Sequence, residues 1–168
     1  MKQINIQYYQ FDTTTYILGS FNNKLCLLDS RKKEKRATLD NRLQKNLNAV
    51  YKEQNDEILE KTKQQLDEYF ARQRKIFDIP LLMVGTDFQK KVWKQLLEIP
   101  YGEILTYKKL ACKIKNSKAI RAVANANGAN SIGIIIPCHR VIGTNGTLRG
   151  YAGGLELKKR LLDIENIG

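Results

Sequence analysis

The chain has 168 residues, of which 42% are hydrophobic and 27% charged, and its formal net charge is +12. This composition is that of a globular protein with one domain or two small ones, and no apolar tract is long enough to span a membrane. Three widely spaced cysteines exclude a disulfide framework, and one histidine with scattered thiols does not form a metal site. An odd cysteine count and a polar N-terminus predict a cytoplasmic protein.

The first part of the chain has the pattern of a small α/β unit. Short apolar runs over residues 1–30 predict strands, and the charge run at 31–36 predicts a solvated loop, with direct DNA contact as the lesser alternative. Apolar spacing predicts one helix over 38–53 and a second over 59–70. The unit is expected to end near residue 84.

The second part opens with a helix start signal. Thr86 followed by Gln89 is a capping box, and the helix behind it carries an apolar face that includes Trp93. The sequence Pro100-Tyr101-Gly102 is expected to end this helix.

Two short helices joined by a tight turn follow, which is the pattern of a helix-turn-helix. Thr106 is expected to cap the first helix and Ser117 the alanine-rich second helix, which offers Arg121 and Asn125 for base contacts. Residues 85–168 hold fourteen Lys/Arg and six Asp/Glu, a net +8, which favours nucleic acid as the partner. The alternatives are helix–helix packing for the small residues and solubility for the basic surface.

Residues 132–142 are an apolar run interrupted by Pro137, Cys138, His139 and Arg140. We expect the flanking aliphatic residues to form a buried strand. Cysteine is strongly nucleophilic and imidazole moves protons near pH 7, so the pattern indicates an activated thiol. A buried cysteine is more often a small apolar side chain, but His and Arg are costly to bury without a role. On a strand, adjacent side chains face opposite ways, so His139 would need a water or a bend to reach Cys138.

The chain closes with a glycine-rich loop and a helix from about Leu155, with Glu165 at its end. A carboxylate at a helix C-terminus is unfavourable unless something pairs with it. We therefore expect Glu165 to have a partner.

Together these motifs resemble one family, the O6-alkylguanine-DNA alkyltransferases, also called methylated-DNA–protein-cysteine methyltransferases. The resemblance covers most of the chain, and the matching motifs follow one another closely from Tyr69 onward. Its parts are Gly85-Thr86-Asp87-Phe88-Gln89, Val92-Trp93, Ile99-Pro100-Tyr101-Gly102-Glu103, Thr106-Tyr107, Arg121-Ala122-Val123-Ala124 and Ile136-Pro137-Cys138-His139-Arg140-Val141.

The resemblance implies an α+β fold with two domains. Residues 1–84 would be a small N-terminal α/β structural domain. Residues 85–168 would be a mostly helical DNA-binding and alkyl-acceptor domain, with a helix-turn-helix and a short active-site strand.

The resemblance also implies DNA repair by direct reversal. The alkyl group of O6-methylguanine, and of O4-methylthymine, in double-stranded DNA would move irreversibly to Cys138 after the base is flipped out. No cofactor would be needed because the protein is the acceptor. The chain would act as a monomer on DNA, with no membrane partner.

The site roles follow from the same resemblance. His139 would draw the proton from Cys138 through a water, Glu165 would hold His139, and Asn130 would be the hinge between the recognition helix and the active site. Tyr107 would donate to N3 of guanine and press on the rotating phosphate. Arg121 would fill the gap left by the base. The DNA surface would also include Ser117, Lys118, Ala122 and Asn125, and the base pocket would include Val141, Tyr151, Ala152 and Arg149.

Two positions depart from the family pattern. Ser131 follows the hinge asparagine where proline is frequent, which loosens the hinge but removes no reactive group. Arg149 stands where some relatives have a small residue, and we hypothesise that it restricts bulky adducts.

Three alternatives remain open at this point. An alkyltransferase-like protein would bind lesions without chemistry, but such relatives lack the acceptor cysteine, which is present here as Cys138. An ordinary helix-turn-helix regulator leaves the Pro-Cys-His-Arg-Val run unexplained. A cysteine hydrolase would need a Cys-His signature that does not surround Cys138.

Overall fold

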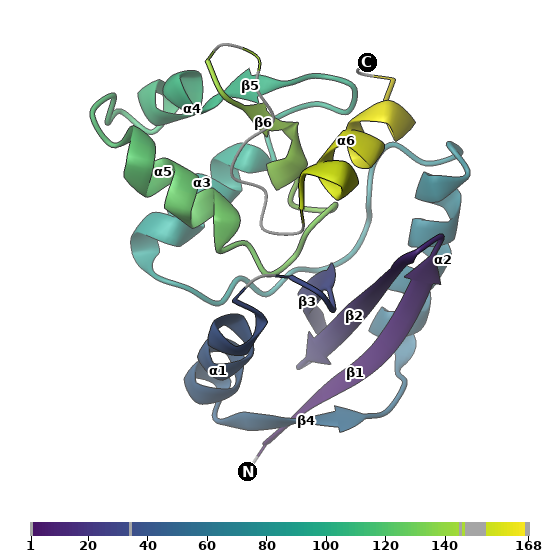
Figure 1. Cartoon of the computed structure of the whole chain (residues 1–168). Helices are drawn as coiled ribbons and strands as arrows, with labels where there is room; N and C mark the ends of the chain where they lie inside the picture. The colour runs from purple at the N-terminus through teal and green to yellow at the C-terminus, as the bar shows by residue number, and fades with distance from the viewer. Residues whose placement is uncertain (1, 34, 145, 147–153, 167–168) are drawn as a thin grey trace. The chain divides into compact units, whose positions relative to one another are not determined.

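The computed structural model describes residues 2–33, 35–144, 146 and 154–166, and it consists of two compact units, Met1–Val84 and Gly85–Gly168 (Figure 1). In the part of the chain that the structure describes, no helix is long and apolar enough to cross a membrane.

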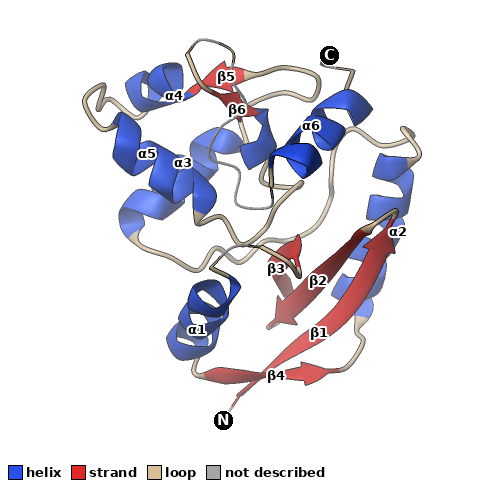
Figure 2. Ribbon diagram, in the orientation of Figure 1, coloured by secondary structure: helices blue, strands red, loops and turns tan. Residues whose placement is uncertain are grey.

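The N-terminal unit is a four-stranded sheet covered by two helices (Figure 2). The strand order is β3-β2-β1-β4, in which β4 runs parallel to β1 and the other pairs are antiparallel. The elements are β1 (Lys2–Phe11), β2 (Thr14–Phe21), β3 (Lys24–Ser30), α1 (Arg36–Leu47), β4 (Ala49–Glu53) and α2 (Glu57–Phe70).

Part of the core of this unit lies between the sheet and α1. Ile4 and Ile6 of β1 alternate with more exposed residues and pack in one cluster with Leu39 and Leu43 of α1. Strands β2 and β3 are buried at nearly every position, as expected for strands covered on both faces.

The expected helix over 38–53 is wrong beyond Leu47. Asn48 adopts a left-handed conformation with φ 47°, and its N–H donates to the carbonyls of Gln44 and Lys45, which ends α1. Val50 and Tyr51 then belong to β4. Their spacing also fits a helix, but a short β-branched and aromatic run after an asparagine favours a strand.

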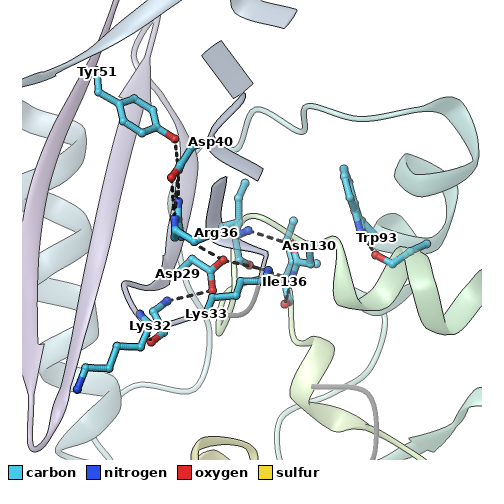
Figure 3. A network of polar contacts seen from close by, with 12 residues as sticks. Asp29, Lys32, Lys33, Arg36, Asp40, Tyr51, Trp93, Asn130 and Ile136 are labelled. Atoms are coloured by element: carbon cyan, nitrogen blue, oxygen red, sulfur yellow. Dashed lines mark hydrogen bonds and ion pairs between the residues drawn. The ribbon is translucent and has the colours of Figure 1, made fainter. Parts of the chain in front are cut away.

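The charge run at 31–36 is not simply a solvated loop. Lys33 is buried, and its Nζ lies 3.0 Å from Oδ2 of Asp29. Arg36 begins α1 and contacts Asp29 at 3.4 Å and Asp40 at 2.6 Å, and the hydroxyl of Tyr51 donates to Asp40 at 2.6 Å (Figure 3). Burial raises the pKa of Asp29, and these cations oppose that rise. Part of the run therefore neutralises a buried carboxylate.

In its described residues the C-terminal unit is mostly helical, and β5 pairs in parallel with β6. Its elements are α3 (Asp87–Leu96), β5 (Leu105–Thr106), α4 (Tyr107–Lys113), α5 (Ile120–Gly128), the 3-10 helix η1 (Cys138–Arg140), β6 (Val141–Ile142) and α6 (Leu155–Ile164).

The predicted capping box is confirmed. The N–H of Gln89 donates to Oγ1 of Thr86 at 3.1 Å, and the N–H of Thr86 donates to Oε1 of Gln89 at 2.9 Å. Trp93 is buried, and its Nε1 donates to the carbonyl of Ala126 at 2.8 Å. This bond holds α3 against α5.

The helix-turn-helix is present, but only one of its two predicted caps is correct. Thr106 caps α4, because its Oγ1 accepts from the N–H of Lys109. Ser117 does not cap α5, which begins at Ile120 after Ala119. The N–H of Ala119 instead donates to the carbonyl of Asn116 at 3.0 Å. A backbone turn thus replaces the expected side-chain cap.

The expected strand before Cys138 is also wrong. The N–H of Ile135 donates to the carbonyl of Gly133 at 2.7 Å, and that of Ile136 to Ile132 at 3.0 Å. Ile134 has a φ of 68°, which a β-branched residue rarely adopts. This stretch is a series of tight turns. Its continuous burial imitates the pattern of a buried strand.

Candidate active site

Cys138 begins the 3-10 turn η1, directly before β6. Its N–H donates to the carbonyl of Ile136 at 2.8 Å, and the N–H of Arg140 donates to that of Pro137 at 3.0 Å. Cys138 is only 6% exposed. In a 3-10 helix successive side chains are rotated by about 120°, rather than pointing to opposite faces as on a strand. The backbone between Cys138 and His139 is therefore bent, unlike the extended strand that the sequence predicted.

Asn130 holds the turns that lead to Cys138. Its Nδ2 donates to the carbonyls of Ile132 at 3.3 Å and Ile136 at 2.9 Å, and its Oδ1 accepts from the N–H of Ile132 at 3.0 Å (Figure 3 labels Asn130 and Ile136). Asn130 is buried, as is Ser131. The amide therefore joins the end of α5 to the reactive turn.

His139 and Glu165 form a buried pair. Nε2 of His139 lies 2.7 Å from Oε2 of Glu165, and the side chains of both residues are fully buried. The carboxylate expected at the end of the last helix thus has a partner. Burial lowers the pKa of His139, although Glu165 opposes that effect. Nδ1 of His139 has no hydrogen-bond partner among the described residues.

Arg140 also binds Glu165. Its Nε lies 2.7 Å from Oε1 of the carboxylate, and its Nη2 lies 3.2 Å from Oε2. Its Nη1 donates to the carbonyl of Ile99 at 2.7 Å. The sequence motif contains Arg140, but a motif alone does not show that it shares a carboxylate with His139.

Lys158 is a site residue that sequence reasoning missed. Its side chain is fully buried, its Nζ donates to the carbonyl of Val141, and that Nζ lies 5.8 Å from the ring centre of Tyr107. Burial lowers the pKa of Lys158 to about 8, and Cys138 opposes that shift. A signal did exist, because Lys158 precedes the apolar Leu161 and Leu162 by three and four positions, on one helix face.

Tyr107, whose ring faces Nζ of Lys158, is also part of the site. It is buried at the start of α4. Asn127, which sequence reasoning also missed, places its Nδ2 3.4 Å from the hydroxyl oxygen of Tyr107 and 3.3 Å from the carbonyl oxygen of Cys138. Burial, with a contribution from Cys138, raises the pKa of Tyr107 to about 12. The phenol therefore remains a hydrogen-bond donor at neutral pH.

An exposed basic face lies on α4, α5 and the turn between them. The chain has no Asp or Glu between Glu103 and Glu156. In α5, Val123, Ala126 and Asn127 point into the unit. Five of the residues predicted to contact DNA are exposed, namely Ser117, Lys118, Arg121, Ala122 and Asn125, whereas Tyr107, predicted to press on the rotating phosphate, is buried.

The structure brings most of the predicted reactive residues into one unit. Cys138 and His139 both lie in η1, and Glu165 follows the last residue of α6. The carbonyl of Val141, a predicted pocket residue, accepts a hydrogen bond from Lys158. Three predicted pocket residues, Tyr151, Ala152 and Arg149, lie outside the described residues. In the part of the chain described, no cluster of His, Cys, Asp and Glu could hold a metal ion.

Comparison with known proteins decides the family. The methylated-DNA–protein-cysteine methyltransferase of Methanosarcina acetivorans is 54% identical over 112 residues, which are 67% of this chain and 72% of that protein. Residues 87–167 match the family model for the 6-O-methylguanine DNA methyltransferase DNA binding domain, and residues 16–83 match that for its ribonuclease-like domain. The chain belongs to the 6-O-methylguanine DNA methyltransferase family.

Other members of this methyltransferase family extend the match. The constitutive methylated-DNA–protein-cysteine methyltransferase of Bacillus subtilis is 53% identical over 110 residues, which are 65% of this chain and 67% of that protein. The crystal structure of Mycobacterium tuberculosis O6-methylguanine methyltransferase superposes with a TM-score of 0.81 at 35% identity, covering 96% of this chain and 92% of that one. A structure of Mycobacterium tuberculosis OGT in complex with DNA gives a TM-score of 0.79 at 36% identity, covering 97% and 92%. The resemblance in the motifs and the α+β fold are both confirmed.

Proposed function

We propose that this chain repairs DNA by direct reversal. It takes the alkyl group from O6-methylguanine, and from O4-methylthymine, in double-stranded DNA onto Cys138, irreversibly and once per molecule. The observation that carries this proposal is the buried His139–Glu165 pair beside Cys138, in the same unit as an exposed basic helix pair. Relatives named as methyltransferases at more than 50% identity support it.

The chemical step is a displacement at the alkyl carbon. Sγ of Cys138 bonds to the methyl carbon while the bond from that carbon to O6 breaks, and the electron pair of the broken bond passes to the guanine. The thiol proton leaves through a water to Nδ1 of His139, and the guanine takes up a proton in turn. A free thiol with a pKa of about 8.5 is mostly protonated at neutral pH, so it requires this base. The protein itself is the acceptor, so the reaction uses no cofactor.

Hydrogen-bond donors stabilise the charge that develops on the leaving guanine. Tyr107 is suited to this role at N3, because its hydroxyl is protonated at neutral pH and the upward shift of its pKa does not change that. Within the proposed pocket, Val141 would read the base edge, and Tyr151, Ala152 and Arg149 would complete it.

The base must leave the duplex before it can react. Extrusion costs roughly a few kcal/mol, and less for a poorly paired lesion. Arg121 is exposed at the start of α5, where it can enter the base stack and fill the gap. Lys118 and its exposed neighbours would contact phosphates without reading sequence, as a protein that scans for lesions requires.

Residues 1–84 would act as a structural domain and residues 85–168 as the DNA-binding and alkyl-acceptor domain, and the protein would act as a monomer. The three cysteines are thiols rather than disulfides, which supports a reducing, cytoplasmic location. The alternative is a protein that binds alkyl lesions without chemistry.

Intact-protein mass after incubation with a duplex that carries one O6-methylguanine separates these two functions. We expect the wild type to gain one methyl group and the DNA to regain guanine. Cys138→Ala should gain nothing, whereas Cys112→Ala, which removes an exposed thiol, should react like the wild type. An unchanged mass with DNA binding retained would establish the lesion-binding alternative instead.

A further inference from the structure

Glu165 is shared between two cationic or potentially cationic side chains. Oε2 lies 2.7 Å from Nε2 of His139 and 3.2 Å from Nη2 of Arg140, while Oε1 lies 2.7 Å from Nε of Arg140. The carboxylate is buried, and Arg140 is only 7% exposed. Two N–H···O contacts from one guanidinium to one carboxylate are stronger and more specific in geometry than hydrogen bonds between neutral groups.

Arg140 is fixed in this position from two further sides. Its Nη1 donates to the carbonyl of Ile99 at 2.7 Å, and its guanidinium carbon lies 5.7 Å from the ring centre of Tyr101. The hydroxyl of Tyr101 in turn donates to the carbonyl of Ile164, next to Glu165. The guanidinium is therefore built into the site and does not swing in from solvent.

The charge balance of this group depends on Arg140. A guanidinium stays protonated in proteins, so Arg140 and an ionised Glu165 together carry no net charge. A protonated His139 would add an uncompensated buried charge beside them, which is costly. The groups that act on His139 are Glu165 and Lys158 from the α6 segment and Arg140 from η1. Two of these three are cations, and only Glu165 favours the imidazolium.

The hydrogen bond also fixes the tautomer. An ionised carboxylate only accepts hydrogen bonds, so a neutral His139 must carry its proton on Nε2. The lone pair then lies on Nδ1, the nitrogen that has no partner among the described residues. Without the guanidinium, the negative charge of Glu165 would be compensated by no cation bound to it. The His139–Glu165 pair would then bind a proton more readily, because protonation would neutralise that charge.

We propose that Arg140 is a positioning residue of the reaction, which holds Glu165 as a carboxylate and so fixes His139 as a neutral base with its lone pair on Nδ1. This inference rests on the proposed function, because it assigns the state in which His139 receives the proton of Cys138. Arg140 itself touches neither the thiol nor the base in this scheme.

Nuclear magnetic resonance of the DNA-free protein tests the proposal without relying on activity. His139 is the only histidine in the chain, so a protein made without a histidine tag gives one set of imidazole nitrogen signals. We expect these signals in the wild type to show a proton on Nε2 and to titrate only below the pH range of an ordinary imidazole. In Arg140→Met they should titrate at a higher pH than in the wild type. A wild-type ring with its proton on Nδ1, or one that titrates near its ordinary pKa, would overturn the proposal even if methyl transfer is found.

Single-turnover transfer rates give the second measurement. Arg140→Met should lose about 100-fold at pH 6.5 but less than about tenfold at pH 8.5, because raising the pH restores the neutral base. Arg140→Lys keeps the positive charge but not the two-point contact, so its rate should fall while its pH profile stays where the wild type has it. Equal losses at every pH in Arg140→Met would reduce Arg140 to a packing role. If Arg140→Met does not fold, the tautomer of His139 in the wild type and the pH profile of the transfer rate of Arg140→Lys still test the proposal.

Discussion

The side-chain amide of Asn127 donates to the hydroxyl oxygen of Tyr107, which leaves the hydroxyl hydrogen of Tyr107 to point elsewhere. The direction of this bond is set by a second one, because the same Nδ2 faces the carbonyl oxygen of Cys138 at 3.3 Å and only a donor fits there. The hydroxyl of Tyr107 therefore acts as a donor toward groups other than Asn127. Asn127 connects this donor to the backbone of the residue that accepts the alkyl group.

Replacing Asn127 by leucine should therefore slow methyl transfer by about tenfold at saturating DNA, because the hydroxyl of Tyr107 loses its fixed orientation. The carbonyl of Cys138 would also lose a buried partner, so we expect the free energy of unfolding to fall by about 1–3 kcal/mol. Single-turnover rates and urea denaturation measure the two effects. Asn41→Leu makes the same change on the exposed surface of α1 and should alter neither. Full transfer activity in Asn127→Leu would remove Asn127 from the mechanism.

Arg121 should matter for extrusion of the base and not for the chemistry that follows. Arg121→Ala should slow repair of a duplex by tenfold or more, on the order of the unstacking cost, since nothing fills the gap left by the base. Repair of the same lesion in single-stranded DNA should fall much less. Lys118→Ala should weaken binding to duplexes with and without the lesion alike and reduce the salt slope by about one. Equal losses of Arg121→Ala on both substrates would mean that Arg121 only supplies charge.

Sequence patterns predicted the elements whose signals are local. The capping box at Thr86 and the helix 59–70 are such cases, and the reactive trio stood out because His and Arg are rarely placed next to a cysteine in an apolar run. Prediction from apolar spacing failed where the same spacing of apolar residues is compatible with both a helix and a strand. Apolar residues at 47, 50 and 51 fit a helix as well as a strand, and Asn48 decides between them through its left-handed conformation.

Other features depend on contacts between distant parts of the chain. The run before Cys138 folds into turns because the side chain of Asn130 satisfies the backbone of Ile132 and Ile136, which no spacing reveals. Similarly, Lys158 and Lys159 look alike in the sequence, yet one is fully buried and the other exposed. The two lysines differ only in the packing of α6, which places Lys158, and not Lys159, against the carbonyl of Val141.

This buried lysine should give the protein a stability that rises with alkaline pH. Burial lowers the pKa of Lys158 to about 8 in the folded protein, whereas an unfolded lysine has its ordinary pKa near 10.5. Between these values the unfolded state binds more protons, so the free energy of unfolding increases as pH rises through this window, by up to about 3 kcal/mol. Below pH 8 that contribution is absent, because the charged form is then present in both states.

Urea denaturation at pH 7.5 and pH 9.5 checks this prediction by comparing variants, since other lysines and tyrosines also titrate there. Lys158→Met should lose the increment between the two pH values, while Lys159→Met, on the exposed side of α6, should retain it. If Lys158→Met and the wild type gain the same amount, Lys158 keeps its ordinary pKa, and its buried ammonium must be stabilised by contacts stronger than the carbonyl of Val141 alone.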